Sequence, residues 1–195
     1  MKILLNQYFL IAVTVSHLNQ IEQISRKCRL SLWTANDYKE ELLREDTFNL
    51  GCIENNSKEM IGFLFARLIK KQIHSLSNNV ISSLETYENN KDINHSENSK
   101  NDEHDVAEII NIAVLPEHQK RGVGQIIFNT LIDFCVINKI NMIWLEVRRS
   151  NIQAQTFYLK NGFQIAYSRK KYYHSPVEDA LILKLCLSFN LNSKI

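Results

Sequence analysis

The 195-residue chain is poor in glycine and proline, lacks an excess of either charge, and has no long apolar run. With only 5 glycines and 2 prolines, glycines that stand close together are expected to serve a local purpose. The 23 Lys and Arg residues nearly balance the 21 Asp and Glu residues, so the formal charge of +2 gives no global reason to bind nucleic acid or an anionic membrane. Hydrophobic residues make up 45% of the chain, which excludes full disorder and suits one globular domain.

Paired cysteine motifs and a membrane-spanning segment are also missing. The 4 cysteines form no CxxC pair and accompany no His-x-x-x-His clip, which favours reduced thiols over a zinc site or a disulfide framework. Asn6 and Gln7 interrupt the apolar start, no small-residue cleavage site follows, and the run is far shorter than the ~20 residues that cross a bilayer. We therefore expect a first strand over 8–13, a cytoplasmic protein and no membrane partner.

Hydrophobic periodicity predicts alternating strands and helices, hence an α/β (α+β) fold with a sheet of mixed strand directions. Helices are expected to begin at Ser16 and at Thr34, where Asp37 completes a capping box, and to span residues 122–138 and 151–160. The segment 106–114 is apolar on both faces, which predicts a central strand. Strands are expected over residues 8–13, 47–53, 60–69, 106–114, 141–148, 163–170 and 180–187.

Residues 75–105 differ from the rest of the chain, because they are crowded with Asn, Ser, Asp, Glu and Lys and their apolar residues show no period. This composition is typical of a solvated, poorly ordered loop. We interpret it as an insertion within a single domain of residues 1–195, and a regulatory or partner-binding role stays open. His95 and His104 lie in it without ligand spacing, so no metal site is predicted.

The segment 114–125 (VLPEHQKRGVGQ) is the most informative, because it joins a predicted buried strand to a predicted helix. Gly122 and Gly124 let a ligand approach the backbone, and free N–H groups at a helix start bind phosphate. A basic surface turn is the alternative interpretation. A Walker loop is excluded because no Lys-Ser or Lys-Thr follows Gly124, and a dinucleotide fingerprint is excluded because Ile127 stands at the third glycine position.

The spacing Gln119-x-x-Gly122-x-Gly124 resembles the acyl-CoA pyrophosphate loop of the GCN5-related N-acetyltransferase (GNAT) superfamily. Further motifs resemble its ribosomal-protein-alanine N-acetyltransferase (RimI-like) branch, namely residues 111–114 (NIAV), 144–148 (WLEVR), Asn151, 157–163 (FYLKNGF), 169–173 (RKKYY) and 178–180 (EDA). The resemblance is close over 107–187, weaker over 1–74 and absent over 75–105. It implies a mixed sheet of about six or seven strands with about four helices.

The resemblance also implies how acetyl-CoA is held, with no metal. The backbone of 112–114 would pair with the pantetheine arm, and residues 120–125 would hold the pyrophosphate. The implied cofactor-binding residues are Ile112, Ala113, Val114, Gln119, Lys120, Arg121, Gly122, Val123, Gly124, Gln125 and Asn151. The implied substrate-binding residues are Trp33, Tyr172 and Tyr173, the last two in a loop before Glu178 that is shorter than in the branch, with Lys171 where Asn is frequent.

Two residues are candidates for the chemistry. Glu146 lies in an apolar strand, on one face with Trp144 and Arg148, and such a carboxylate is costly unless it is paired or functional. It is either a salt-bridged structural residue or a general base for a substrate ammonium, whose reference pKa is near ~8 for an α-amine. Tyr158 is either a core aromatic beside Phe157 or, by the resemblance, the acid that protonates the departing CoA thiolate.

We therefore expect an acetyl-CoA-dependent N-acetyltransferase that modifies the N-terminal α-amino group of a protein, by the resemblance a ribosomal small-subunit protein that begins with Ala. Transfer is expected to be direct, because no cysteine stands near the motif in the sequence. Acetylation of a Lys side chain or a small-molecule amine is the alternative, and a non-catalytic CoA-binding module is the second. One short basic and aromatic cluster does not support nucleic-acid binding. A monomer or weak oligomer is expected.

Overall fold

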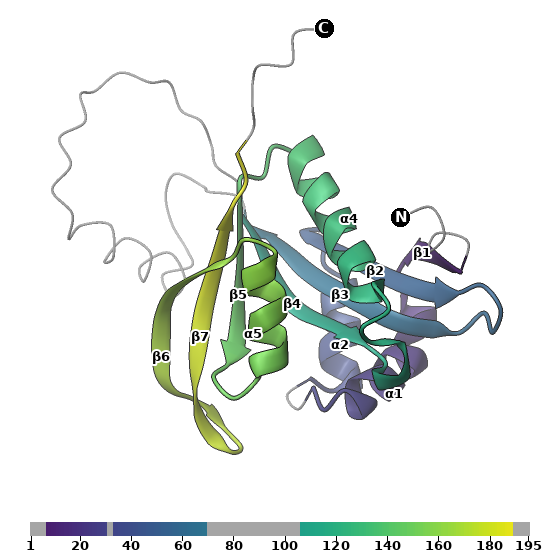
Figure 1. Cartoon of the computed structure of the whole chain (residues 1–195). Coiled ribbons are helices and arrows are strands. Elements are labelled where there is room, and N and C mark those ends of the chain that lie inside the picture. Colours follow the sequence, from purple (N-terminus) through teal and green to yellow (C-terminus); the bar gives the residue numbers. More distant parts are fainter. Residues whose placement is uncertain (1–6, 31–32, 70–105, 189–195) are drawn as a thin grey trace, which may run out of the picture.

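The computed structural model describes residues 7–30, 33–69 and 106–188, which form a seven-stranded sheet with helices on both faces (Figure 1). The expected insertion at 75–105 lies outside the described residues. The strands are β1 (Tyr8–Ala12), β2 (Thr47–Glu54), β3 (Met60–Ile69), β4 (Val106–Val114), β5 (Met142–Arg148), β6 (Gln164–His174) and β7 (Val177–Cys186). The helices are α1 (Leu18–Lys27), α2 (Ala35–Leu42), α4 (Val123–Ile137) and α5 (Ile152–Lys160), with 3-10 turns at Val15–His17 and Pro116–His118.

The strand order is β1-β2-β3-β4-β5-β7-β6, and neighbours are antiparallel except for the parallel pair β4 and β5. Helices α1 and α2 lie on one face of the sheet, and α4 and α5 lie on the other (Figure 1). The predicted fold class, a mixed sheet flanked by helices, is confirmed. This layering follows from the sequence, because each strand alternates side chains between the two faces and each helix needs a sheet face to bury its apolar stripe.

Local sequence explains where the helices begin. The capping box predicted at Thr34 is confirmed, because the Thr34 N–H donates to Asp37 Oδ2 at 2.6 Å and the Asp37 N–H donates to Thr34 Oγ1 at 3.3 Å. The start predicted at Ser16 is wrong. Thr14 is the N-cap of a short 3-10 turn that contains Ser16, and α1 begins only at Leu18. A 3-10 turn tightens the helix entry, so the capping position moves toward the N-terminus.

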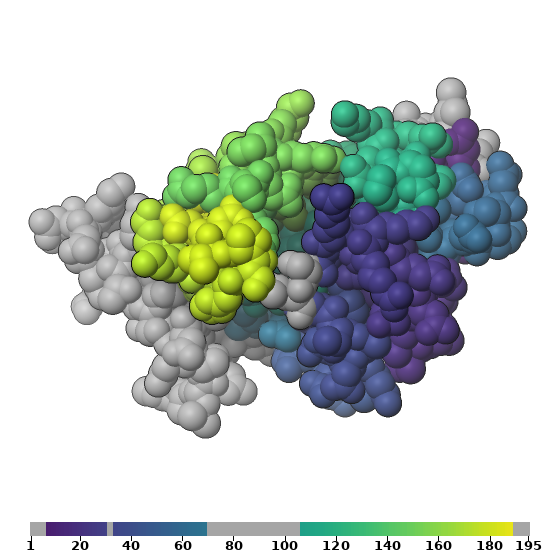
Figure 2. All heavy atoms as spheres, turned by 90° about the horizontal axis from the view of Figure 1, so that it is seen from below, coloured from purple at the N-terminus to yellow at the C-terminus, as the bar shows by residue number. Residues whose placement is uncertain are grey.

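The central feature of the sheet is that β4 and β5 separate. They pair only over Val106–Ile109 and Met142–Leu145. Beyond this point β4 follows β3 and β5 follows β7, so the two strands diverge (Figure 1). A bulge in β4 marks the place, because Ala66 faces Ile109 whereas Phe65 faces Asn111, which leaves one extra residue between them. Seen from below, the N-terminal and C-terminal elements form two masses with a recess between them (Figure 2).

Candidate active site

The turn between β4 and α4 has a backbone shaped for an anion. Lys120 and Gly122 have φ angles of 57° and 84°, in the left-handed region, while the turn connects β4 to the first residue of α4, Val123. Successive N–H groups in such mixed conformations form a concave anion site. Gly122 is the N-cap and has no side chain to occupy the N–H groups of the first turn. The strand, turn and helix arrangement predicted for this segment is therefore present.

The two glycines of the turn are required for different reasons. Gly122 needs to be glycine because of its left-handed backbone. A Cβ atom on Gly124 would meet Phe157 and Val114 side-chain carbons at 3.9 Å, an ordinary contact distance. Neither backbone conformation nor packing within the described residues therefore calls for glycine at 124. A ligand that approaches the start of α4 closely would call for it.

Three of the predicted cofactor-binding side chains make hydrogen bonds within the chain. Gln119 donates to the Val114 carbonyl at 2.8 Å and accepts from Gln153 of α5 at 3.0 Å. Asn151 caps α5 through the Ala154 N–H at 3.1 Å. Gln125 donates to Asn129 and Asn161, at 2.8 and 2.6 Å. The Gln119 and Gln125 contacts fix the turn against α5 and the Asn151 contact caps α5, so the three side chains have a structural role whether or not they also touch a ligand.

The expectation that no cysteine lies near this motif is wrong. Cys28, at the C-terminal end of α1, donates a hydrogen bond from Sγ to the Val114 carbonyl at 3.2 Å. Sequence separation hid this contact, because α1 packs against β4 only in the folded chain. Burial, followed by the Glu117 carboxylate, raises the pKa of the Cys28 thiol. A thiol that stays protonated is a poor nucleophile, so direct transfer remains the prediction.

On β5, Glu146 lies on the half-buried face with Trp144 and Arg148, as strand alternation predicts, and the opposite face is buried. Its carboxylate is ion-paired with Arg169 of β6, with side-chain exposures of 22% for Glu146 and 27% for Arg169. Burial, followed by the nearby Glu146, raises the pKa of Tyr172 to about 12. Glu146 thus has the ion pair that a structural glutamate needs, and this pair lies where β5 separates from β4.

The loop expected around Tyr172 and Tyr173 is wrong, because both residues belong to β6. Arg169 pairs with Ala180 and Tyr173 with Glu178, so three residues of β6 oppose Asp179 alone. This bulge is held by Asp179, which accepts from the Lys171 N–H and from Lys170 Nζ, both at 3.0 Å. A bulge changes the direction of side chains, and here Tyr172 comes within electrostatic range of Glu146.

Tyr158 points from α5 into the core and is only 5% exposed. Its ring packs edge-on against Phe157 and Phe163, with centroid distances of 5.5 and 5.3 Å. Burial, followed by the nearby Tyr173, raises the pKa of Tyr158, so its hydroxyl stays protonated at neutral pH. Tyr173 also interacts electrostatically with Glu146, so it lies near both predicted catalytic side chains.

Trp33 lies directly before α2, in a cluster of aromatic rings. Its ring is 5.1 Å from Tyr38 and 6.5 Å from Phe65, which gives it a packing role. It also lines a hollow of about 310 Å³ together with Asp37, Glu40, Glu41, Arg44 and Arg67. Contact of Trp33 with a substrate remains a prediction.

Sequence reasoning missed Glu108, which lies in β4 between Arg67 of β3 and Trp144 of β5. Burial, followed by the Glu146 carboxylate, raises the pKa of Glu108, while Arg67 and Arg169 oppose the shift. The signal was available, because a carboxylate in an otherwise apolar strand is the same feature that singled out Glu146. The segment 106–114 was instead treated as apolar on both faces.

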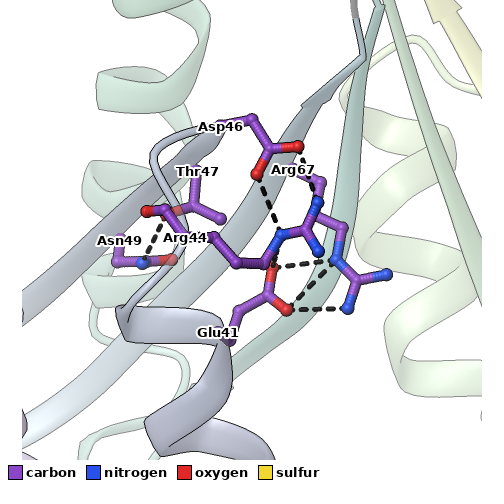
Figure 3. A network of polar contacts seen from close by, with 6 residues as sticks. All are labelled: Glu41, Arg44, Asp46, Thr47, Asn49 and Arg67. Carbon is purple, nitrogen blue, oxygen red and sulfur yellow. Dashed lines mark hydrogen bonds and ion pairs between the residues drawn. The ribbon is translucent and has the colours of Figure 1, made fainter.

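Arg67 also belongs to a network of polar contacts with Glu41, Arg44 and Asp46 (Figure 3). The Glu41 carboxylate, only 2% exposed, accepts from Arg67 Nε at 2.9 Å and from Arg67 Nη2 at 2.7 Å. Arg44 lies beside it and pairs with Asp46 at 2.6 Å. Charged side chains thus cross the sheet from α2 to β6, past the point where β4 and β5 separate.

Within residues 7–30, 33–69 and 106–188, no three His, Cys, Asp or Glu side chains gather as metal ligands. No helix of this described part is long and apolar enough to span a bilayer.

Comparisons with solved structures identify proteins that share this fold. The chain superposes on the crystal structure of the ribosomal-protein-S18-alanine N-acetyltransferase of Escherichia coli with a TM-score of 0.68 and 22% identity, covering 96% of this chain and 99% of that chain. For NAA60 of Arabidopsis thaliana in complex with acetyl-CoA the TM-score is 0.73 and the identity 17%, covering 92% of this chain and 98% of that chain. At these identities the likeness shows the fold alone.

Sequence comparisons are more specific. The [ribosomal protein bS18]-alanine N-acetyltransferases of Salmonella typhimurium and Escherichia coli are 41% and 40% identical over 86 residues, which is 43% of this chain and 58% of each relative. The chain thus matches little more than half the length of these relatives. A model of the acetyltransferase (GNAT) family matches residues 18–163. Because this match covers well over half of the sequence, the chain belongs to the acetyltransferase (GNAT) family.

Proposed function

We propose that the chain is an acetyl-CoA-dependent N-acetyltransferase whose acceptor is the N-terminal α-amino group of a ribosomal small-subunit protein that begins with Ala. The observation that carries the proposal is the separation of β4 from β5 directly before the anion-binding turn at 119–124. The names of the relatives that match at about 40% identity support the acceptor. We place this activity in the cytoplasm and expect a monomer or weak oligomer.

The described residues fit acetyl-CoA. Over Asn111–Val114, β4 pairs with β3 along one edge only, and its other edge faces the opening toward β5. Such an edge can pair with the amide groups of the pantetheine arm. The turn then offers backbone N–H groups, with Lys120 and Arg121 beside them, to the diphosphate. When bound, acetyl-CoA supplies an activated acetyl thioester.

Within the chain, Glu146 is the proposed proton acceptor for the substrate ammonium, directly or through a water molecule. Tyr158 is the proposed donor of a proton to the leaving thiolate, and its raised pKa keeps that proton in place before the reaction. Cys28 forms no acyl intermediate, because burial keeps its thiol protonated. Glu108 lies close enough to Glu146 for the two carboxylates to interact, and the Glu146 carboxylate helps to raise the pKa of Glu108.

An acetyl-transfer assay with four acceptors tests the proposal. The acceptors are a peptide with a free N-terminal Ala, the same peptide with a blocked N-terminus, a blocked peptide that contains Lys, and a polyamine. We expect turnover of the first peptide and loss of turnover when its N-terminus is blocked. Turnover of only the Lys peptide or the polyamine would replace the proposed acceptor with a side-chain or small-molecule amine.

A further inference from the structure

The carboxylate that the proposed mechanism needs is already occupied in this structure. Arg169 pairs with Glu146, and aromatic side chains hold the guanidinium in place. Arg169 Nη2 donates to the Tyr167 hydroxyl at 3.4 Å, and the guanidinium lies 5.9 Å from the Tyr167 ring and 5.5 Å from the Tyr172 ring. Because both partners are more than two-thirds buried and two aromatic rings lie within 5.9 Å of the guanidinium, this pair is better defined than an ordinary surface ion pair.

The other charges near Glu146 have other partners. On its own strand, Arg148 pairs with Glu178 at 3.3 Å and lies 3.9 Å from the Tyr173 ring. From the α2 side, Arg67 pairs with Glu41. On β7 the register partner of Glu146 is the apolar Ile182. The titratable groups that interact electrostatically with Glu146 include Glu108 from β4 and Arg169, Tyr172 and Tyr173 from β6.

We infer that Arg169 is a positioning residue that holds Glu146 in the free protein and yields part of that carboxylate to the substrate ammonium. This inference rests on the proposed function. Two cations then share one carboxylate, so the guanidinium stays beside the bound ammonium. Like charges at short range disfavour the protonated form, so the guanidinium lowers the pH at which the bound amine gives up its proton. One N–H bond breaks, one O–H bond forms on Glu146, and Arg169 keeps its charge throughout.

The proposed sharing of the Glu146 carboxylate predicts two effects of the variant Arg169→Gln, one on KM and one on the pH profile of kcat. Without the competing guanidinium, the peptide should bind Glu146 more tightly, so KM for the peptide should fall. Without the neighbouring positive charge, the bound ammonium should keep its proton to higher pH. The acidic limb of the kcat profile should therefore move up by about one pH unit, the lower end of what a nearby charge produces. An ion pair with only a structural role would change stability and leave the peptide KM in place.

Matched variants isolate the effect. Lys170→Gln removes the same charge from the next residue of β6, but its side chain is 76% exposed and pairs with Asp179, which keeps its bond from the Lys171 N–H. Its kcat profile should match that of the wild type. Arg169→Lys keeps the charge and should restore most of the profile. In a Glu146→Gln background, removal of Arg169 should cause no further shift, because the carboxylate that links the two is gone.

The measurement is steady-state kinetics with the amine that the wild type acetylates best, from about 2.5 pH units below to about 1 unit above the ~8 reference pKa of an α-amine. A lower peptide KM together with a shifted kcat limb for Arg169→Gln supports the inference. A folded Arg169→Gln protein with an unchanged limb overturns it and leaves the proposed function intact. A wild-type protein that acetylates none of the four acceptors overturns the proposed function, and with it the inference.

Discussion

The turn before α4 and the hairpin of β6 and β7 are held in different ways, although both contribute residues to the proposed site. The turn is defined by its backbone, with left-handed φ angles at Lys120 and Gly122. The hairpin is defined by side chains, since Asp179 holds its bulge and Arg169 pairs with Glu146. A site built from backbone groups can be recognised in the sequence by its glycines. A site built from side chains depends on which residues the strand register brings together.

The largest expected effect comes from the two proposed catalytic side chains. Glu146→Gln cannot accept a proton and Tyr158→Phe cannot donate one, and such roles are typically each associated with about 10²–10⁴-fold in rate. We expect kcat to fall by that order in both variants while acetyl-CoA affinity, measured by calorimetry, stays near that of the wild type. Loss of Glu146 should remove the acidic limb of kcat/KM, and loss of the Tyr158 hydroxyl should leave it.

The opposite result would identify Glu146 as a structural residue. In that case the Gln variant would unfold at lower temperature because Arg169 loses its partner. Once folded it would turn over at the wild-type rate. Normal turnover by a folded Glu146→Gln protein would therefore leave water or the free amine itself as the route for the proton.

The second effect tests the turn. Gly124→Val places a branched side chain where a diphosphate would approach the backbone, and hydrogen bonds to a charged group contribute about 1.5–3 kcal/mol. Acetyl-CoA affinity should fall about 10- to 100-fold. The fold should survive, because a Cβ at this position meets its neighbours at 3.9 Å. Gly122→Val should weaken binding too, but its left-handed φ adds strain, so thermal melts must accompany it.

Gly124→Ala is the matched control for the turn, since it adds only the Cβ atom that the protein accommodates. Its affinity should lie between those of the wild type and the Val variant. Unchanged acetyl-CoA affinity in a folded Gly124→Val protein would show that the diphosphate does not contact this turn.

The third effect tests the hairpin. Asp179→Ala removes the acceptor of the Lys171 N–H and should relax the bulge that contains Tyr172, a residue within electrostatic range of Glu146. A lost hydrogen bond costs about 0.5–1.5 kcal/mol, so peptide KM should rise about threefold to tenfold. Acetyl-CoA affinity should not change, because the turn is a separate region. Asp133→Ala on the exposed face of α4 serves as the control. An equal rise of peptide KM in that variant would show that the bulge has no specific role in peptide binding.

The smallest effect is a pH dependence confined to the hairpin. Hydrogen bonds from Ser150 to Glu178, and from Lys171 and Lys170 to Asp179, hold the pKa of both carboxyl groups below their ordinary values. A lowered folded-state pKa stabilises the protein above about pH 4 and loses that contribution as pH falls through the folded value. Between pH 7 and pH 3 the double variant Glu178→Gln with Asp179→Asn should therefore lose less thermal stability than the wild type.

Much of the fold was predictable because each element carries its own signal. The capping box at Thr34 and the alternation of β5 depend on residues a few positions apart, and both predictions are confirmed. Ser16 was misplaced because serine and threonine compete for the same cap, and a 3-10 turn follows Thr14. The loop expected around Tyr172 follows from the family resemblance and is wrong, because the pairing of β6 with β7 and the bond from the Lys171 N–H to Asp179 keep this segment in a strand.

The resemblance to a known family singled out Tyr158. The sequence alone determined the order of strands and helices along the chain, the turn with its two glycines and the candidate residue Glu146. These depend on side-chain periodicity and backbone preferences, which are local properties of the chain. Only the tertiary structure decided that Cys28 lies against Val114, that Glu108 lies within electrostatic range of Glu146, and that Arg169 pairs with Glu146. Those contacts depend on which strands become neighbours and on two β-bulges that shift their register, and no local pattern encodes either.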